Sequence, residues 1–488
     1  MQVVNFLATA FLLAGILVPV GAEPAADWET TLRANLDGMA AQLESTLKPW
    51  PVPARTFAAE SCGAVADGAT LDTMALQKAI DACSAAGGGT VLLSKGDYVS
   101  GTIELKSGVM LEIAKGSRLL ASAKLADFPA RVPVHTTIMD TYYRVTTSLI
   151  YAENCDRVGI CGEGEIDGRG RSFSGPTTSG PMPGRPFLLR FVECRNVVMD
   201  GIHLRNAAAW MEDYLACDNV ILQNLHVENQ ANGNNDGIDM DGCHNAVIRD
   251  CFINAEDDGL CFKGASGRTM ENILVERCKI YSTCNPLKFG TDSQGGFRNA
   301  LIRNVDLGSP TADMPSLIRR PSRAGIAWES IDGGDVENLV CTKVHIDHAQ
   351  AAIFLRLGKR DRVVPGQPKV KSALHHIVFD DITAENCTNI GSIITGVPSA
   401  RVEDVVLRNV HASVAGKGRI QGPKPEKEAQ YPTVAMFGQS PAYGFWIRHA
   451  QNIAFFNVTT TPIAPDPRPA FVNGPDTANV TLDGKPLP

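Results

Sequence analysis

Acidic side chains gather in two neighbouring short segments, residues 234–242 (N-N-D-G-I-D-M-D-G) and 256–264 (E-D-D-G-L-C-F-K-G). When D-G-I is aligned with D-G-L, Asp236 falls on Asp258, so the segments are two copies of one repeat. Carboxylates that lie close together repel one another, and their pKa values move apart. One carboxyl can then act as an acid while its neighbour acts as a base. The pattern predicts an acid/base site made of Asp236, Asp257 and Asp258.

The acidic residues and their neighbours in the repeat can also be explained without a chemical role. An aspartate before glycine is common in turns, but three in adjacent repeats exceed what turns require. Asp239 and Asp241 fit a solvated strand face equally well. Lys263 fits a group that only offsets nearby acids. Trp210, one repeat upstream, fits either the core or a platform on which a sugar stacks.

A longer repeat surrounds the acidic segments. Short β-type segments recur with an Asn turn, and from Asn196 the spacings are 23, 26, 27, 27 and 39 residues. This period and pattern predict an all-β fold, a parallel β-helix in which each coil packs on its neighbours. A leucine-rich repeat has a similar period, but its L-x-x-L-x-L framework is missing. The repeat asparagines are Asn196, Asn219, Asn245, Asn272, Asn299 and Asn338, and we expect them to form an Asn ladder or turns.

Stacking of the coils places equivalent residues about 4.8 Å apart, and side chains alternate inward and outward along each strand. We expect an inward set of Ile238, Met240, Leu260, Phe262, Leu287, Phe289, Ile326 and Trp328. One outward column then holds Asp239, Cys261, Lys288, Ala327 and Arg356, its neighbour holds Asp241, Lys263, Gly290 and Glu329, and the preceding corner holds Asp236, Asp258 and Asn285.

Outside the repeat, the sequence predicts an N-terminal segment with helices and two insertions. A helix is predicted at residues 27–48, and an amphipathic pattern predicts another at residues 70–86. We expect an N-terminal helix to cap the solenoid. The long spacing before Asn338 predicts an insertion at residues 310–323, and a second insertion, rich in Lys, Gly and Pro, is predicted at residues 415–432. Such loops on one face of a solenoid commonly wall a binding groove. We expect an N-terminal segment at residues 23–60 and the β-helix at residues 61–488.

The first residues indicate export. An apolar run at residues 6–18 precedes Val20-Gly21-Ala22, which suits a signal peptide at residues 1–22. The run is too short for a membrane anchor. The basic residue that usually precedes the apolar run of a signal peptide is missing. We therefore expect a secreted or periplasmic protein that does not remain in a membrane.

Composition and cysteine spacing indicate which partners and metals to expect. The net charge is −8 and no long basic run occurs, which excludes nucleic acid as an expected partner. No C-x-x-C pair with zinc spacing is present among the 13 cysteines. Cys155, Cys194, Cys217 and Cys243 each precede a repeat Asn or Arg by two residues, which predicts a ladder of small buried side chains. We expect no metal, no cofactor and a monomer.

The acidic motifs resemble those of glycoside hydrolase family 28, the polygalacturonase-like proteins. N-N-D-G-I-D is similar to that family's N-T-D motif, and E-D-D-G-L-C-F-K-G to its D-D motif; C-G-A-V-A-D-G and A-Y-G-F-W-I-R-H extend the resemblance from Ser61 to about Val480. The resemblance implies a single-stranded right-handed parallel β-helix, a pectic polysaccharide or oligosaccharide as substrate, and inverting hydrolysis. It also implies that Asp257 is the general acid and that Asp236 and Asp258 position and deprotonate water.

Two motifs depart from that family's pattern. Cys284-Asn285-Pro286 stands where G-H-G is expected, and Ala327-Trp328-Glu329 stands where R-I-K is expected. The Arg and Lys of R-I-K would bind a galacturonate carboxylate, whereas Glu329 would repel it. We expect activity on a rhamnose-containing or side-chain pectic substrate, resembling exo-acting members. The expected substrate-binding residues are Lys288, Arg356, Asn285, Glu329, Lys263, Asp239 and Trp210.

Two alternatives stay open on the same scaffold. A polysaccharide lyase would use the acids to hold Ca²⁺ and a basic residue such as Lys288, beside Asp239, to take a proton. A glycan-binding β-helix would use the same surface without catalysis. Ultraviolet-absorbing products, chelator sensitivity and new reducing ends distinguish the three functions.

Overall fold

The computed structural model describes residues 25–173, 182–362, 364, 366 and 368–487 of the 488-residue chain. The predicted signal peptide, residues 1–22, lies outside the described residues. Within them, no helix combines the length and the apolar character needed to cross a bilayer.

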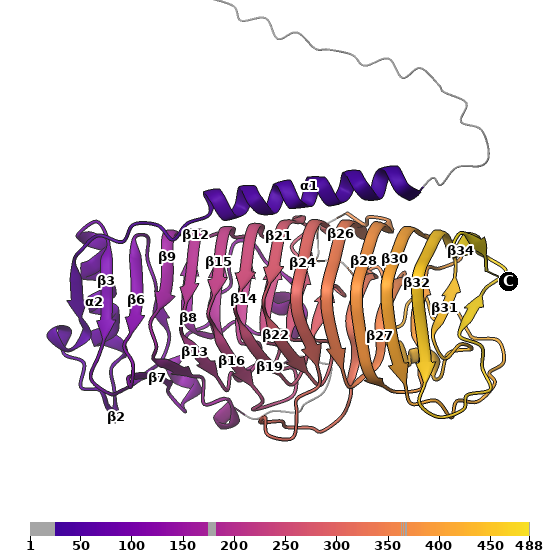
Figure 1. Ribbon diagram of the computed structural model, residues 1–488. Helices are drawn as coiled ribbons and strands as arrows, with labels where there is room; N and C mark the ends of the chain where they lie inside the picture. Colours follow the sequence, from indigo (N-terminus) through magenta and orange to yellow (C-terminus); the bar gives the residue numbers. More distant parts are fainter. Residues whose placement is uncertain (1–24, 174–181, 363, 365, 367, 488) are drawn as a thin grey trace, which may run out of the picture.

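The described chain winds into a right-handed parallel β-helix, as predicted (Figure 1). Two parallel sheets wrap one apolar core, and the antiparallel pair β34–β35 closes the C-terminal end. The smaller sheet, which carries the acidic segments, contains in chain order β5 (Ile103–Glu104), β8 (Ser148–Glu153), β11 (Phe187–Val192), β14 (Glu212–Leu215), β17 (Ile238–Asp241), β20 (Leu260–Lys263), β23 (Leu287–Phe289), β25 (Ser322–Ser330), β27 (Ala349–Leu357), β29 (Ser392–Thr395), β31 (Phe445–Arg448) and β33 (Phe471–Asn473).

The larger sheet forms the other sides of the coils. It contains β1 (Thr56–Ala58), β2 (Asp67–Leu71), β3 (Gly89–Leu93), β4 (Asp97–Ser100), β6 (Val109–Ile113), β7 (Arg118–Ala121), β9 (Asp156–Cys161), β10 (Glu165–Asp167), β12 (Arg195–Asp200), β13 (His203–Arg205), β15 (Asp218–Gln223), β16 (His226–Asn229), β18 (His244–Arg249), β19 (Phe252–Ala255), β21 (Met270–Glu276), β22 (Lys279–Ser282), β24 (Phe297–Gly308), β26 (Gly334–Asp347), β28 (Ser372–Cys387), β30 (Val402–Val414), β32 (Ala450–Pro462), β34 (Ala478–Leu482) and β35 (Lys485–Pro486). Short helical turns are η1 (Ala59–Cys62), η2 (Leu125–Asp127), η3 (Met139–Tyr143), η4 (Gly170–Phe173) and η5 (Val434–Phe437).

Two helices accompany the solenoid, close to the predicted ranges. α2 (Thr73–Ala85) buries Leu76, Ile80 and Cys83 against the first coils and caps the N-terminal end. α1 (Ala25–Thr46) instead lies along the outside of the coils (Figure 1). Its buried face packs on one apolar residue from each of seven strands, namely Val247, Leu274, Leu301, Val340, Val378, Val406 and Ala454. An apolar stripe thus joins the helix to the solenoid wall.

The predicted inward residues form the core. Ile238, Met240 and their equivalents in the next three coils are all fully buried, and the ring centroids of Phe262 and Phe289 lie 4.6 Å apart. The four ladder cysteines are buried, and all 13 cysteines lie in the described part of the chain as free thiols. The structure therefore confirms the inward and outward alternation that the sequence predicts.

The repeat asparagines form a ladder at a turn. Each adopts a positive φ between 55° and 59°, a backbone conformation that asparagine tolerates better than most residues. From Asn219 onward, each Nδ2 donates a hydrogen bond to Oδ1 of the asparagine one coil before, at 3.0–3.4 Å. The ladder fixes the register between coils and thereby the columns that carry the acidic residues.

Candidate active site

Asp236 and Asp258 lie in equivalent corners, directly before β17 and β20. Gly237 and Gly259 follow them, and the coils approach so closely there that a Cβ atom on Gly237 would lie 2.5 Å from the Gly259 carbonyl oxygen. The Gly237 amide donates to the Asp258 carbonyl at 2.9 Å. The D-G pair is thus required by the stacking, and the stacking places the two carboxyls in successive coils.

Asp258 is buried and accepts hydrogen bonds from three side chains, the longest from the Cys261 thiol at 3.9 Å. Lys288 Nζ lies 2.7 Å from Oδ2, and Asn285 Nδ2 donates to Oδ1 at 2.8 Å. Burial by itself would raise the pKa of Asp258, but the Lys288 and Lys263 charges and the hydrogen bonds from Lys288 and Asn285 outweigh burial and lower it. Asp258 is therefore the ionised carboxylate of the pair.

Asp236 is equally buried, but its surroundings favour the protonated form. Burial, followed by the charges of Asp239 and Asp257, raises the pKa of Asp236 well above its usual value. Lys263 opposes this only weakly, since its Nζ is 3.9 Å from Asp236 and 3.1 Å from Asp239. Asp236 and Asp258 thus differ in protonation although they occupy the same position of the repeat.

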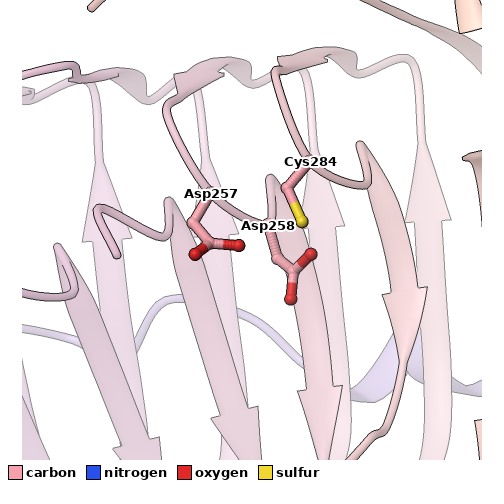
Figure 2. Close-up of side chains that lie close together, drawn as sticks. All are labelled: Asp257, Asp258 and Cys284. Carbon is pink, nitrogen blue, oxygen red and sulfur yellow. The ribbon is translucent and has the colours of Figure 1, made fainter. Parts of the chain in front are cut away.

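Asp257 is half-buried, and its carboxylate accepts a hydrogen bond from Asn234 at 3.2 Å. Carboxylate oxygens of Asp257 and Asp258 and the Cys284 sulfur all lie within 4.8 Å of one another. Figure 2 shows the Cys284 thiol pointing toward Asp258, with Asp257 beside it. Burial raises the pKa of Cys284 well above its usual value, so the sulfur stays a neutral thiol.

The three groups of Figure 2 have the donor types of a cation site. One carboxylate of the set already has a cationic partner, because the Lys288 ammonium contacts Asp258 at 2.7 Å. A thiol kept protonated by burial is also a poor ligand, since metals bind the thiolate. The arrangement is better suited to acid/base chemistry than to holding a metal ion.

Three predicted substrate-binding residues form a buried group beside the acids. Lys263 pairs with Asp239, and its Nζ lies 4.4 Å from the Trp210 ring centroid. Trp210 packs in a buried apolar cluster with Phe187. Burial raises the pKa of Asp239 to about 8. All three are buried and contact other protein groups.

The strand pairing at Glu329 and Arg356 differs from the predicted outward columns. Arg356 pairs in register with Glu329, whereas Ala327 pairs with Phe354. The prediction that Arg356 shares the column of Asp239 and Lys288 is therefore wrong by two residues. A shift of two keeps the residue on the same face, so alternation could not exclude it.

Lys288 also has a different neighbour from the one expected. It does share a column with Asp239, through Cys261. Its ammonium, however, contacts Asp258 and the Tyr431 hydroxyl, while Lys263 is the partner of Asp239.

Glu329 lies buried in the outward column, and its Oε2 has no hydrogen-bond partner among the described residues. Burial raises the pKa of Glu329 to about 7. In mildly acidic solution this carboxyl is neutral, so the repulsion of a uronate predicted from the sequence does not apply there.

Residues from the two insertions join the site and were missed in the sequence. Tyr431, from the 415–432 insertion, accepts a hydrogen bond from Lys288 at 3.1 Å, and 43% of its surface is exposed. Arg323, at the end of the 310–323 insertion, is half-buried and its charge interacts with Asp257 and Asp258. The insertions were predicted as walls of a binding site, but no repeat marks which of their residues face the acids.

Comparison with known proteins agrees with the acidic motifs. Residues 83–296 match the model of glycosyl hydrolases family 28, a segment that includes Asp236, Asp257 and Asp258. The match confirms the resemblance to glycosyl hydrolases family 28 that the sequence predicts. The chain is thus a glycoside hydrolase, as predicted.

The proteins similar to this chain include polygalacturonases and exopolygalacturonases. A probable polygalacturonase from Vitis vinifera is 24% identical over 375 residues, which cover 73% of this chain and 74% of the relative. An exopolygalacturonase from Thermotoga maritima superposes with a TM-score of 0.68 at 18% identity, covering 87% of this chain and 96% of the other. The Yersinia enterocolitica family 28 exopolygalacturonase gives 0.68 at 19% identity, covering 89% and 79%. At these identities the superpositions establish the fold, while the family match establishes the class of enzyme.

Proposed function

We propose that this hydrolase cleaves a glycosidic bond in a uronate-containing pectic chain, with Asp257 as the general acid and Asp236 and Asp258 on the attacking water. The observation that carries the proposal is the opposite displacement of the pKa values of Asp236 and Asp258 beside the half-buried Asp257. Environments that push the pKa values of neighbouring carboxyls apart keep one carboxyl ionised as a base while its neighbour holds a proton.

The roles follow from protonation and access. Asp258 is held ionised and takes the proton of the water. Asp236, protonated in mildly acidic solution, keeps a second negative charge away from Asp258 and holds the water by a hydrogen bond. Asp257 is the least buried of the three, so it is the group that reaches the leaving oxygen and protonates it.

The names of the similar proteins and the charges of the site both support a substrate class. The relatives named above act on polygalacturonate, which makes a pectic chain the substrate class. The strand that should carry R-I-K carries Ala327, Trp328 and Glu329, so a carboxylate in that subsite lacks its usual cations. We therefore propose a rhamnose-containing or side-chain pectic substrate in preference to unbranched polygalacturonate. Export through residues 1–22 would place the enzyme where such polymers occur.

The test is hydrolysis of a panel of pectic oligosaccharides, read by product mass and by the anomer released. Asp257→Asn should lower turnover by at least about 10³-fold and leave the melting temperature unchanged, since the side chains have the same shape. The variant Asp335→Asn, on the exposed edge of β26, is the control. Turnover by Asp257→Asn near that of the control would remove Asp257 from the mechanism.

Stereochemistry is a separate outcome of the same experiment. The closest approach of Asp257 and Asp258 is within 4.8 Å, shorter than the roughly 6.5–9.5 Å between carboxyl groups of an inverting pair. Inversion is proposed because the water is assigned to Asp236 and Asp258 jointly. Release of the product with retained configuration would overturn this assignment. A product that absorbs ultraviolet light would show that the bond is cleaved by elimination and not by hydrolysis.

A further inference from the structure

Arg323 is a half-buried arginine whose guanidinium makes no hydrogen bond, ion pair or ring contact with any described residue. A guanidinium carries five N–H donors, and leaving them unpaired in a partly desolvated position costs free energy. Its charge interacts with Cys284, Asp257, Tyr431 and Asp258. An unpaired cation facing the catalytic carboxyls indicates that a ligand supplies its partner.

The backbone around Arg323 is fixed to the acidic segment. Its amide donates to the Cys284 carbonyl oxygen at 2.6 Å, and Ser322 Oγ donates to the Ser282 carbonyl oxygen at 2.7 Å. Ser282 and Thr283 in turn donate their hydroxyl groups to the carbonyl oxygens of Asp257 and Glu256. Arg323 is thereby held one coil from Cys284 and two coils from the proposed general acid, at the end of the insertion.

The other cations around the acids already have partners. Lys263 pairs with Asp239, and Lys288 pairs with Asp258. Arg356 donates to the carbonyl oxygens of Gly396, Glu426 and Lys427. Arg320, the neighbour on the insertion, uses its Nε for the Thr283 carbonyl. Arg323 alone in this set keeps its whole fork free.

We propose that Arg323 binds the carboxylate of the uronate unit next to the scissile bond, and that it is the specificity-determining cation of this enzyme. The assignment rests on the proposed function, because it takes the substrate to be anionic. Planar guanidinium and carboxylate groups match in bidentate geometry. Arg323 is the second residue of β25, whereas the missing R-I-K would lie further along that strand. The bound carboxylate is therefore displaced toward the edge that carries Asp257.

Binding, rather than turnover, tests the proposal. The Asp257→Asn protein is titrated with a galacturonate–rhamnose tetrasaccharide and with its methyl ester, which has the same linkages and no charge. Adding Arg323→Gln should weaken binding of the acid roughly 10- to 100-fold, the cost of a lost charge-assisted hydrogen-bond pair. Binding of the ester should change less than about twofold. Arg323→Lys, which keeps the charge without the fork, should give an intermediate affinity.

The control variant is Arg401→Gln, which removes an exposed arginine bonded to Gln451 and changes the net charge equally. It should bind both ligands as the parent does. The proposal is overturned by unchanged binding of the acid, by an equal loss for acid and ester, or by no measurable binding of either ligand to the parent. Melting temperatures show that each variant is folded. A wild-type enzyme that hydrolyses no pectic oligosaccharide would refute the proposed function separately, since the titration does not depend on catalysis.

Discussion

Asp236 and Asp258 occupy the same position in successive coils, yet a lysine ammonium contacts Asp258 at 2.7 Å, whereas the nearest one to Asp236 lies at 3.9 Å. An opposite charge within about 4–6 Å lowers a carboxyl pKa by roughly 1–3 units. Lys288 also donates one of the hydrogen bonds to Asp258. The ionisation that the mechanism requires therefore depends on one buried side chain two strands away from β17.

Replacement of Lys288 by methionine tests this dependence. Without the ammonium, the pKa of Asp258 should rise, so the acid limb of the pH–activity curve should move to higher pH by about 1 unit or more. Activity near pH 4 should fall much more than activity near pH 6. Lys279→Met, at an exposed position of β22, is the matched control. A uniform loss at every pH, with the acid limb in place, would mean that Lys288 has only a structural role.

The sequence predicted the acids but not all of their partners. Asp236, Asp257 and Asp258 were found because a repeat superposes them, and Asn285 and Lys288 because they continue the same columns. Arg323 and Tyr431 belong to insertions, where no period relates a residue to a column. Their positions depend on how the insertions fold back, which local patterns do not encode.

At the scale of the element, the 415–432 insertion is attached to the solenoid by Arg356. The buried guanidinium donates to Gly396 in the wall and, at 2.9 and 3.3 Å, to the carbonyl oxygens of Glu426 and Lys427 in the insertion. The same insertion delivers Tyr431 to Lys288. Arg356, predicted as a substrate-binding residue, thus holds the insertion that borders the site.

Arg356→Met should release this segment. The loss of several buried hydrogen bonds to a charged group should lower the free energy of unfolding by about 2–4 kcal/mol. Hydrogen exchange should accelerate in residues 415–432 more than in β27. Arg401→Met, at the exposed position directly before β30, provides the comparison. Unchanged exchange across the insertion would show that other contacts hold it.

For the whole molecule, the repeat predicted the architecture because one coil explains the next. Core residues, the Asn ladder and the cysteine ladder all follow from a single period. The position of α1 did not follow, since its apolar stripe fits the end of the solenoid as well as its side. The deciding feature is the outward row from Val247 to Ala454, which matches Leu32, Leu36, Ala40 and Leu43 along the helix.

Burial of many carboxyls makes the stability of the whole fold depend on pH. Burial raises the pKa values of Glu212 and Asp239 to about 8, and those of Asp213, Glu256 and Glu329 to about 7. Such a carboxyl binds its proton more tightly in the folded than in the unfolded chain, where its pKa is about 4. Stability should therefore be highest in mild acid and fall as pH rises from about 4 toward 8. Ionised carboxylates such as Asp258, whose pKa is lowered, lose their contribution only below about pH 4.

Urea unfolding at pH 5 and pH 8 measures this effect. The free energy of unfolding should be lower at pH 8 by roughly 3 kcal/mol or more. His203, His244 and His449, whose pKa values burial lowers, act in the opposite sense below about pH 6.5, but they are fewer and less buried. Glu212→Gln, which removes a fully buried carboxyl bonded to Tyr214, should flatten the dependence, and the exposed Glu163→Gln should not. Equal or greater stability at pH 8 would show that the buried carboxyls stay ionised in the folded protein, and the protonated state assigned to Asp236 would then lose its physical basis.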